Sequence, residues 1–343
     1  MSELWDPWEI SEGGFPKAGT SSEKLRYLLN YAVLAPSGHN SQPWLFKIVD
    51  DEVQLYADRT RALPVCDPED RELIMACGAA LFHLRIALRH FGYEGKVQTF
   101  PDRNEPDLLA RVGFGGKGKP TAEEQLFFKA IPKRRTNRMP FDSREVPEKV
   151  LSELKEAASK EGAWLEIVKE NERNKVADLI AEGDRIQMAD SRFRREVAAW
   201  IHPNRSASHD GMPAYALGLG GLTSSFAPIV VRTFDMGKGQ AAKDRQLATG
   251  SPVLAVLGTD DDAPADWLSA GQALDRVLLR ARAEEIWASF LNQPIEVPEL
   301  RPKVRDLLGR KGYPQLLLRM GYGRDIKSTP RRTAGEVLRR PLR

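Results

Sequence analysis

Apolar residues recur at helical spacing near the start of the chain and then switch to strand spacing. One helical stripe is formed by Leu25, Leu28, Leu29 and Ala32. Ser22 is a candidate N-cap for this helix, and Pro36 should end it. Over residues 44–49 the apolar side chains alternate with others, which predicts a strand buried mainly on one face.

Three sequence blocks occur twice along the chain, in the same order. The matching pairs are EKLRYLLNYA and EKVLSELKEAA, CGAALFHL and AGQALDRV, and LLARVGFG and LLLRMGYG. Because repeated blocks in a conserved order indicate duplication, a helix–strand–helix–strand unit is predicted twice. The two copies span about residues 23–115 and 148–323.

The copies differ by one large insertion. Glu23 lies 55 residues before Gly78, whereas the matching Glu148 lies 123 residues before Gly271. The additional residues fall at about 169–250, and an insertion of this size in a compact domain is usually a lid, a substrate-binding flap or an oligomer contact.

These patterns give a domain plan. Residues 1–21 are predicted to be an arm laid over the body and anchored by Trp5, Trp8 and Phe15. Residues 22–125 form the first repeat. Residues 126–343 form the second repeat, with the lid-like insertion at about 169–250.

Composition narrows the class of protein. The 343 residues carry 51 Lys and Arg against 48 Asp and Glu, and this net charge of +3 is too balanced for a dedicated nucleic-acid binder. No apolar run approaches the roughly 18 residues of a membrane span, and the acidic N-terminus does not read as a signal peptide. Cys66 and Cys77 cannot build a disulfide framework. We expect a cytoplasmic globular protein without a nucleic-acid or membrane partner.

Polar groups crowd the connection between the first predicted helix and strand. The sequence APSGHNSQPW occupies residues 35–44. One interpretation is a binding loop whose donors and acceptors surround a flat polar ring. The other is a hydrogen-bonded turn that ends with Trp44 in the core, and composition alone does not separate the two.

A basic motif follows the first repeat. IPKRRTNRMPF, residues 131–141, places Arg134, Arg135 and Arg138 around Thr136. If a helix starts there, Arg134 and Arg138 share one face. Guanidinium forks and a hydroxyl suit a phosphate group, but a solvated turn or a nucleic-acid contact is the alternative.

A second basic motif lies close to the C-terminus. Residues 328–333 place Arg331 and Arg332 beside hydroxyl side chains. Alone, this motif is equally consistent with a basic tail.

Other chemistries have little support in the sequence. Gly113, Gly115 and Gly118 fit G-x-G-x-x-G, but Lys-Pro follows them where a dinucleotide site needs an apolar helix. The histidines and cysteines show no metal-ligand spacing, so no metal is predicted.

The motifs together resemble the nitroreductase-like, FMN-binding flavoprotein family, in particular its long, internally duplicated, Acg-like branch. The polar loop resembles that family's loop against the flavin, and RRTNR resembles its RRSxR phosphate motif, with Thr136 in place of Ser. NQPIEVPELR, from Asn292, resembles the segment that passes the flavin ring, and TPRR resembles the C-terminal phosphate contact. The similarity covers about residues 22–340. It implies an α+β fold in which two tandem repeats form a pseudo-dimer, with central sheets flanked by helices.

The resemblance also implies one FMN per chain and the residues that bind it. These are Ser37, His39, Asn40, Gln42, Pro43, Trp44, Arg134, Arg135, Thr136, Arg138, Glu296, Val297, Arg331 and Arg332. Only the first copy has the polar loop, and only the second has RRTNR before its opening helix. The two halves should therefore build one composite pocket. No catalytic side chain is implied, because the flavin carries the chemistry.

The resemblance implies an FMN-dependent NAD(P)H oxidoreductase that passes hydride to a nitroaromatic, a quinone or a similar acceptor. The alternative is a flavin storage or sequestration protein that the insertion seals. A third hypothesis, a nucleic-acid or partner-binding module that uses the arginines, predicts a colourless protein. The chain is expected to be a pseudo-dimeric monomer, and further homodimerisation is left open.

Overall fold

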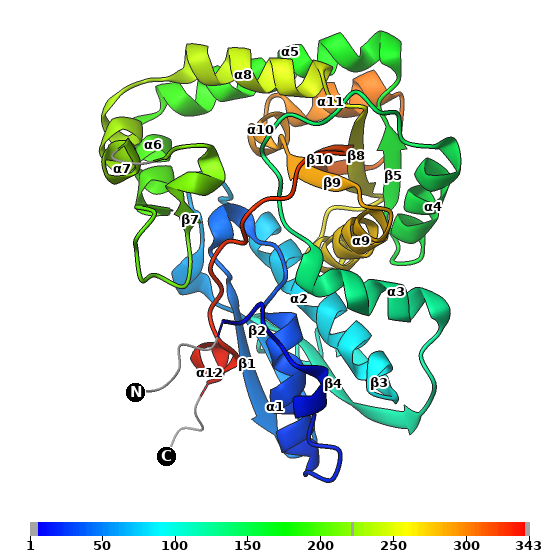
Figure 1. The fold of residues 1–343 in the computed structure, drawn as a ribbon. Coiled ribbons are helices and arrows are strands. Elements are labelled where there is room, and N and C mark those ends of the chain that lie inside the picture. The colour runs from blue at the N-terminus through cyan, green and yellow to red at the C-terminus, as the bar shows by residue number, and fades with distance from the viewer. Residues whose placement is uncertain (1–5, 221–222, 340–343) are drawn as a thin grey trace.

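Two four-stranded sheets divide the molecule into two halves (Figure 1). The computed structural model describes residues 6–220 and 223–339. Outside these ranges lie residues 1–5 of the predicted arm, including Trp5, residues 221–222 of the insertion, and residues 340–343. The first sheet has the order β1 (Trp44–Val49), β2 (Glu52–Ala57), β4 (Leu108–Lys117), β3 (Tyr93–Thr99). The second has the order β5 (Trp164–Ile167), β8 (Val253–Thr259), β10 (Tyr313–Gly321), β9 (Trp287–Phe290).

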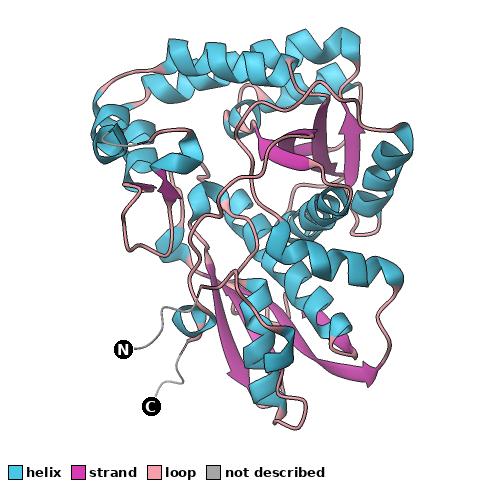
Figure 2. Cartoon of the chain, in the orientation of Figure 1, coloured by secondary structure: helices cyan, strands magenta, loops and turns pink. Residues whose placement is uncertain are grey.

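The two sheets have equivalent connectivity. In each repeat the first strand lies at an edge beside the second, and the last strand lies between the second and the third. Every neighbouring pair is antiparallel. Figure 2 shows both sheets flanked by helices. The predicted pair of tandem α+β repeats is therefore confirmed by the strand order.

The helices of the two repeats also match in length. The opening helices α1 (Ser21–Ala32) and α4 (Glu148–Ser159) have 12 residues each, and the central helices α2 (Arg71–His90) and α9 (Pro264–Ala283) have 20 each. Thr20, and not Ser22, caps α1, because the Thr20 hydroxyl accepts the Glu23 N–H while the Glu23 carboxylate accepts the Thr20 N–H. The remaining helices outside the insertion are α3 (Ala122–Ala130), α10 (Gln293–Glu296), α11 (Arg301–Leu308) and α12 (Ala334–Val337).

Helices α2 and α9 pack against each other at the centre of the molecule (Figure 1). The two equivalent glycines allow the close approach, since a Cβ on Gly78 would collide with the carbonyl of Leu268 and one on Gly271 with that of Met75. His83 Nε2 lies 2.6 Å from Asp275 Oδ2 across the same interface, and both side chains are fully buried. The α2 helix is long and apolar enough to cross a bilayer, but 83% of its apolar stretch is buried inside the protein.

The insertion forms a helical layer over the second half. It contains α5 (Glu170–Ala189), α6 (Ser191–Ala199), the short pair β6 (Ile201–His202) and β7 (Met212–Pro213), α7 (Thr223–Thr233) and α8 (Gly237–Thr249). Helices α5 and α8 pack along each other, and α6 and α7 lie beside the gap between the two halves (Figure 1). This layer, residues 170–249, is called the lid below.

The chain crosses between the halves twice. After the first repeat, Thr136 pairs with Ala288 of β9, and Asn137 N donates to the Ala288 carbonyl at 3.0 Å. After the second repeat, Leu338 pairs with Phe46 of β1, and Arg339 N donates to the Phe46 carbonyl at 2.7 Å. Each sheet is thus extended by chain that follows the other.

Two aromatic residues fix the N-terminal arm. Trp8 Nε1 donates to the Thr329 carbonyl at 2.8 Å, and the Phe15 ring stacks on Phe91 with centroids 4.1 Å apart. The arm therefore lies against the C-terminal segment at one end and the first repeat at the other.

Candidate functional site

Two adjoining cavities lie between the repeats and the lid. The smaller has a volume of about 250 Å³ and the larger about 760 Å³. Both are lined by Pro36, Ser37, Thr136, Arg138 and Met212, so they meet where the polar loop approaches the basic motif and the lid. Residues of both repeats contribute to the walls of these cavities.

The polar loop connecting α1 to β1 has a strained backbone. His39, Asn40 and Gln42 have φ angles of 51°, 57° and 53°, values that non-glycine residues rarely adopt. Such strain persists where surrounding contacts impose it, typically at ligand sites. Here Ser37 Oγ accepts the Gln42 N–H at 2.9 Å, and Asn40 Nδ2 donates to the carbonyls of Gly211 and Pro330 at 2.9 and 3.0 Å.

The first half of the loop faces the cavities and the second half does not. Ser37 lines both cavities, His39 the larger and Asn40 the smaller. Gln42 instead donates to the His209 carbonyl at 2.8 Å and accepts the Arg332 N–H at 2.8 Å. Pro43 and Trp44 line neither cavity. The Pro43 carbonyl accepts the Asp58 N–H, and Trp44 is fully buried at the start of β1.

His39 is held neutral. Burial, together with the charge of nearby Arg138, lowers the pKa of His39 to about 4. Its Nε2 is buried without a hydrogen-bond partner. A neutral imidazole offers one donor and one acceptor, so His39 presents polar capacity to a ligand without adding charge.

Four cations surround the smaller cavity: Arg135, Arg138, Lys327 and Arg331. The Arg331 guanidinium donates to Asn40 Oδ1 and Thr329 Oγ1, both at 2.7 Å. The Trp8 ring lies 5.5 Å from the Arg135 guanidinium carbon and 5.0 Å from that of Arg331. Thr136 adds a hydroxyl to the wall.

These cations lack acidic partners. Within residues 6–220 and 223–339, no carboxylate forms an ion pair with Arg138 or Arg331, and Arg135 has only a long one to Asp325 at 3.9 Å. Burial lowers the pKa of Arg138, and burial together with Arg134 lowers the pKa of Arg331 well below its usual value. Because buried guanidiniums need charged or hydrogen-bonding partners, this cavity suits an anion.

Two arginines of the basic motifs face elsewhere. The segment 134–138 is not helical, and Arg134 is buried with its Nη2 donating to the Leu34 carbonyl at 3.1 Å. Arg332 donates to the carbonyls of Gln42 and Glu336, both at 3.1 Å. Neither side chain lines a cavity. Both hold the loop and the C-terminal segment in place.

The larger cavity is mostly apolar with an acidic region. Glu296, at the end of α10, lines it and accepts a hydrogen bond from Gln187 Nε2 at 2.5 Å. Burial raises the pKa of Glu296. Val297, beside it, is 4% exposed and packs in the core of the second repeat. Glu72, Asp184 and Asp244 complete the acidic lining.

Several lining residues had no motif to mark them. Trp8, Met212, Tyr215 and Lys327 line the smaller cavity, and most of the larger cavity's apolar wall comes from the lid. One available signal was Asp184, which occupies a position on the apolar stripe of α5 between Ile180 and Met188. A carboxylate at such a position is unusual in a buried helix face.

Comparison with known proteins agrees with this architecture. No family model matches the chain. It is 33% identical to "Putative NAD(P)H nitroreductase Rv3131" of Mycobacterium tuberculosis over 333 residues, covering 95% of this chain and 93% of the relative. It is 29% identical to "Putative NAD(P)H nitroreductase acg" of the same organism, covering 94% and 97%.

The fold also has a solved counterpart. The crystal structure of "a putative nitroreductase" from Anabaena variabilis superposes with a TM-score of 0.50 at 10% identity, covering 94% of this chain and 93% of that one. Since sequence similarity extends over nearly the full length of relatives at up to 33% identity, this chain belongs to the nitroreductase-like family, in the long branch that includes Acg.

Proposed function

We propose that the protein is an FMN-dependent NAD(P)H oxidoreductase that binds one FMN per chain and passes hydride from reduced nicotinamide to a nitroaromatic, a quinone or a similar acceptor. The observation that carries the proposal is the cationic cavity that opens into a larger, mainly apolar one. A phosphate-bearing ligand with a flat ring matches this division. The names of the relatives support the same assignment.

The residues present fit FMN on two grounds. Among the residues that the structure describes, Arg135 and Arg331 each keep a buried Nε without a hydrogen-bond partner, and Arg138 has only the Met212 sulfur, 3.8 Å from its Nη2. A phosphate would supply the missing acceptors. His39 Nε2 lacks a partner at the junction with the larger cavity, where the polar edge of a flavin ring would lie.

Bound FMN would supply the hydride chemistry. The chain's own residues bind, orient and shield. Arg135, Arg138 and Arg331 hold the anionic end, and Arg331 at the same time fixes Asn40 of the loop. The lid contributes Met188, Phe193 and other apolar side chains to the opposite wall, which excludes water from the space beside the ring.

The space available favours turnover over storage. The larger cavity alone, about 760 Å³, is within the usual range of small-molecule pockets. A nicotinamide or an acceptor would therefore have room beside the ring. The storage alternative is a second candidate because the lid supplies most of the apolar wall, and a lid that stayed closed would prevent ligand exchange.

One experiment separates the two candidates. The purified protein should be yellow with one FMN per chain, and anaerobic NADPH or NADH should bleach the flavin rapidly. Addition of menadione or 4-nitrobenzoate should then restore the oxidised spectrum. Persistent absorbance over a long incubation would identify a storage protein, and a chain with no FMN, or with two, would overturn the proposed site.

A further inference from the structure

Three of the four carboxylates in the acidic region of the larger cavity come from the lid and α10, and the fourth, Glu72 of α2, pairs with Arg71 at 3.4 Å. Asp184 comes from α5, Asp244 from α8 and Glu296 from α10, and all three line the cavity. Asp184 is 4% exposed and Asp244 is 6% exposed. These three carboxylates are called the acidic end below. Glu296 is among the predicted flavin-binding residues, but Asp184 and Asp244 are not, and the proposed flavin contacts do not explain their positions.

Neutral amides are their hydrogen-bond donors. Gln293 Nε2 bridges two of them, with distances of 3.1 Å to Asp184 Oδ1 and 2.8 Å to Asp244 Oδ2. Gln240 Nε2 also donates to Asp244 Oδ2, at 2.8 Å, and Gln187 Nε2 donates to Glu296. Among the described residues, none of the three carboxylates forms an ion pair.

Two acceptor atoms of this network, Asp184 Oδ2 and Gln293 Oε1, have no hydrogen-bond partner among the described residues. Asp184 Oδ2 is buried without a hydrogen bond, on a side chain that lines the cavity. Burial and the charge of Asp244 raise the pKa of Asp184 to about 8, so the ionised form is costly unless a cationic donor reaches its free oxygen. The surrounding network is therefore incomplete at an atom that a cavity ligand could contact.

The neighbouring cations do not neutralise this end. Lys243 and Arg319 also line the cavity but make no ion pair with Asp184, Asp244 or Glu296. The Arg319 Nη atoms donate to the carbonyls of Asn137 and Met139 at 3.1 to 3.2 Å. Their positive charges lower the free-energy cost of keeping these carboxylates ionised, but only through longer-range attraction.

An organic cation suits the acidic end better than a metal ion. The described residues contain no group of three or more His, Cys, Asp and Glu side chains arranged to hold a metal. An ammonium or amidinium group carries N–H donors that can meet Asp184 Oδ2. The surrounding apolar wall suits the hydrocarbon part of the same molecule.

We infer that the acidic end is a subsite for a basic nitrogen group, so that the acceptors of this enzyme are aromatic compounds bearing an amine, amidine or guanidine. That these compounds act as electron acceptors rests on the proposed function. That the acidic end binds a cationic group does not depend on it. The cavity would then be polarised, with guanidiniums holding the anionic cofactor on one side and carboxylates holding the cationic substrate on the other.

Equilibrium binding of matched probes tests this inference. Protein as purified is titrated calorimetrically with 4-nitrobenzylamine and with 4-nitrobenzyl alcohol, which have similar shapes but differ in charge. We expect the amine to bind at least about tenfold more tightly, as one charged hydrogen bond would give. Asp184→Asn or Asp244→Asn should reduce this preference to about twofold or less.

A control on the same helix isolates the effect. Asp178 is exposed on α5 and pairs with Arg245 at 2.7 Å, so Asp178→Asn should keep the full preference. Equal affinities of the two probes for the unaltered protein would overturn the inference, as would a preference that survives in both cavity variants. A chain without flavin, or one that nicotinamide does not reduce, would contradict the proposed function while leaving this titration informative.

Discussion

The two repeats share their framework and differ in their connections. Both have the same strand order and central helices of 20 residues. Between the opening helix and the first strand, however, the first repeat has residues 33–43, whereas the second has only residues 160–163. The lid follows β5 in the second repeat, whereas β1 turns directly into β2.

This difference separates the parts of the duplicated fold that form the core from the parts that line the cavities. The conserved parts are those that bury the core, and the diverged parts are loops and insertions that line the cavities. Many of the charged and polar wall residues come from the polar loop, the segment 134–138, the lid and the C-terminal segment 327–331. Elements that only one copy possesses thus add the polar loop, the basic segment and the lid to walls that the shared helices and strands also line.

The shared framework is most sensitive where the two copies touch. Gly271→Ala should destabilise the protein by about 3 kcal/mol or more, or prevent folding, because its methyl group would meet the backbone of Met75. Gly239, in α8, has open space around it, and Gly239→Ala should change stability by about 1 kcal/mol at most. Urea denaturation of both variants makes the comparison. If Gly271→Ala were as stable as the unaltered protein, the close contact between α9 and α2 at Gly271 would be contradicted.

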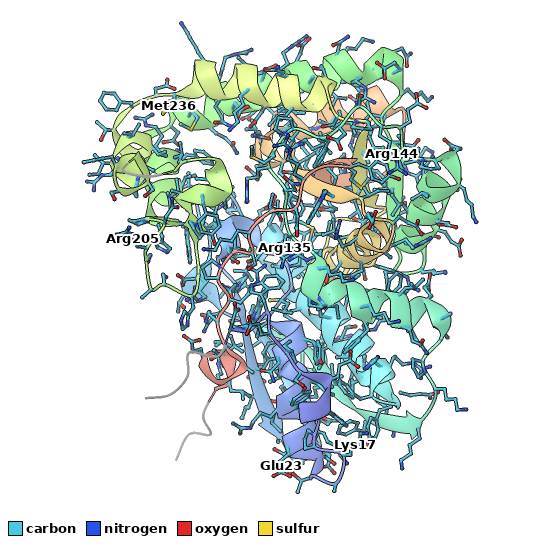
Figure 3. All side chains as sticks on the ribbon, viewed as in Figure 1. Lys17, Glu23, Arg135, Arg144, Arg205 and Met236 are labelled. Carbon is cyan, nitrogen blue, oxygen red and sulfur yellow. The ribbon has the colours of Figure 1, made fainter. Side chains whose placement is uncertain are left out.

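The diverged part should control flavin binding. Arg138→Gln should weaken FMN binding at least about tenfold, since a charge-assisted hydrogen bond to phosphate is lost. Arg144 is exposed and stacks 3.9 Å from the Tyr322 ring centroid, away from the cavities, so Arg144→Gln should retain FMN. Figure 3 labels Arg144 far from Arg135 of the smaller cavity. FMN content after dialysis measures the difference, and equal retention would rule out Arg138 as a ligand.

The polar loop should make stability depend on pH. The pKa of His39 is lowered to about 4 in the folded protein, against about 6.5 in an unfolded chain. Between these values the unfolded state binds the extra proton, so stability should fall as the pH drops from about 6.5 to 4, by roughly 1–3 kcal/mol. His39→Gln should show a shallower decline over this window in chemical denaturation. Parallel profiles would mean that His39 is not buried as a neutral ring.

The smallest expected effect distinguishes the opening helices. Thr20→Ala removes the capping box of α1 and should cost about 1 kcal/mol. Helix α4 begins after Pro147 without a side-chain cap, so it has no equivalent contribution to lose. Ser21→Ala, one position later, should stay within about 0.5 kcal/mol of the unaltered protein. Thermal melting of the pair tests this, and a Thr20→Ala protein as stable as Ser21→Ala would contradict it.

Sequence patterns were sufficient to predict the helices and strands that the two repeats share, because these elements follow the periodicity of apolar residues. The apolar stripe that begins at Leu25 and the alternation after Trp44 are local signals for α1 and β1. The repeated Gly-x-Ala-Leu block was identified without a reason for its glycine. The reason is a contact between helices nearly 200 positions apart, and no local pattern contains it.

Motifs identified the segments of the site but not the direction of each side chain. Ser37, His39 and Asn40 face the cavities, while Gln42 and Trp44 of the same motif do not. Positive φ angles turn successive side chains of this loop to different sides, and these angles cannot be read from residue types. The acidic end was not found for another reason: Asp184 and Asp244 belong to the lid, whose placement follows from packing against α10 and not from any motif.

The crossing of the chain between the halves has a consequence for its biosynthesis. Domains tend to fold from the N-terminus as the ribosome delivers them. Here the outer edge of β1 gains its neighbour at residues 338–339, and Arg331 reaches Asn40 from the far end of the chain. The outer edge of β1 therefore stays unpaired until residues 338–339 have left the ribosome, and a chain that stops short of residue 331 lacks a cation of the smaller cavity.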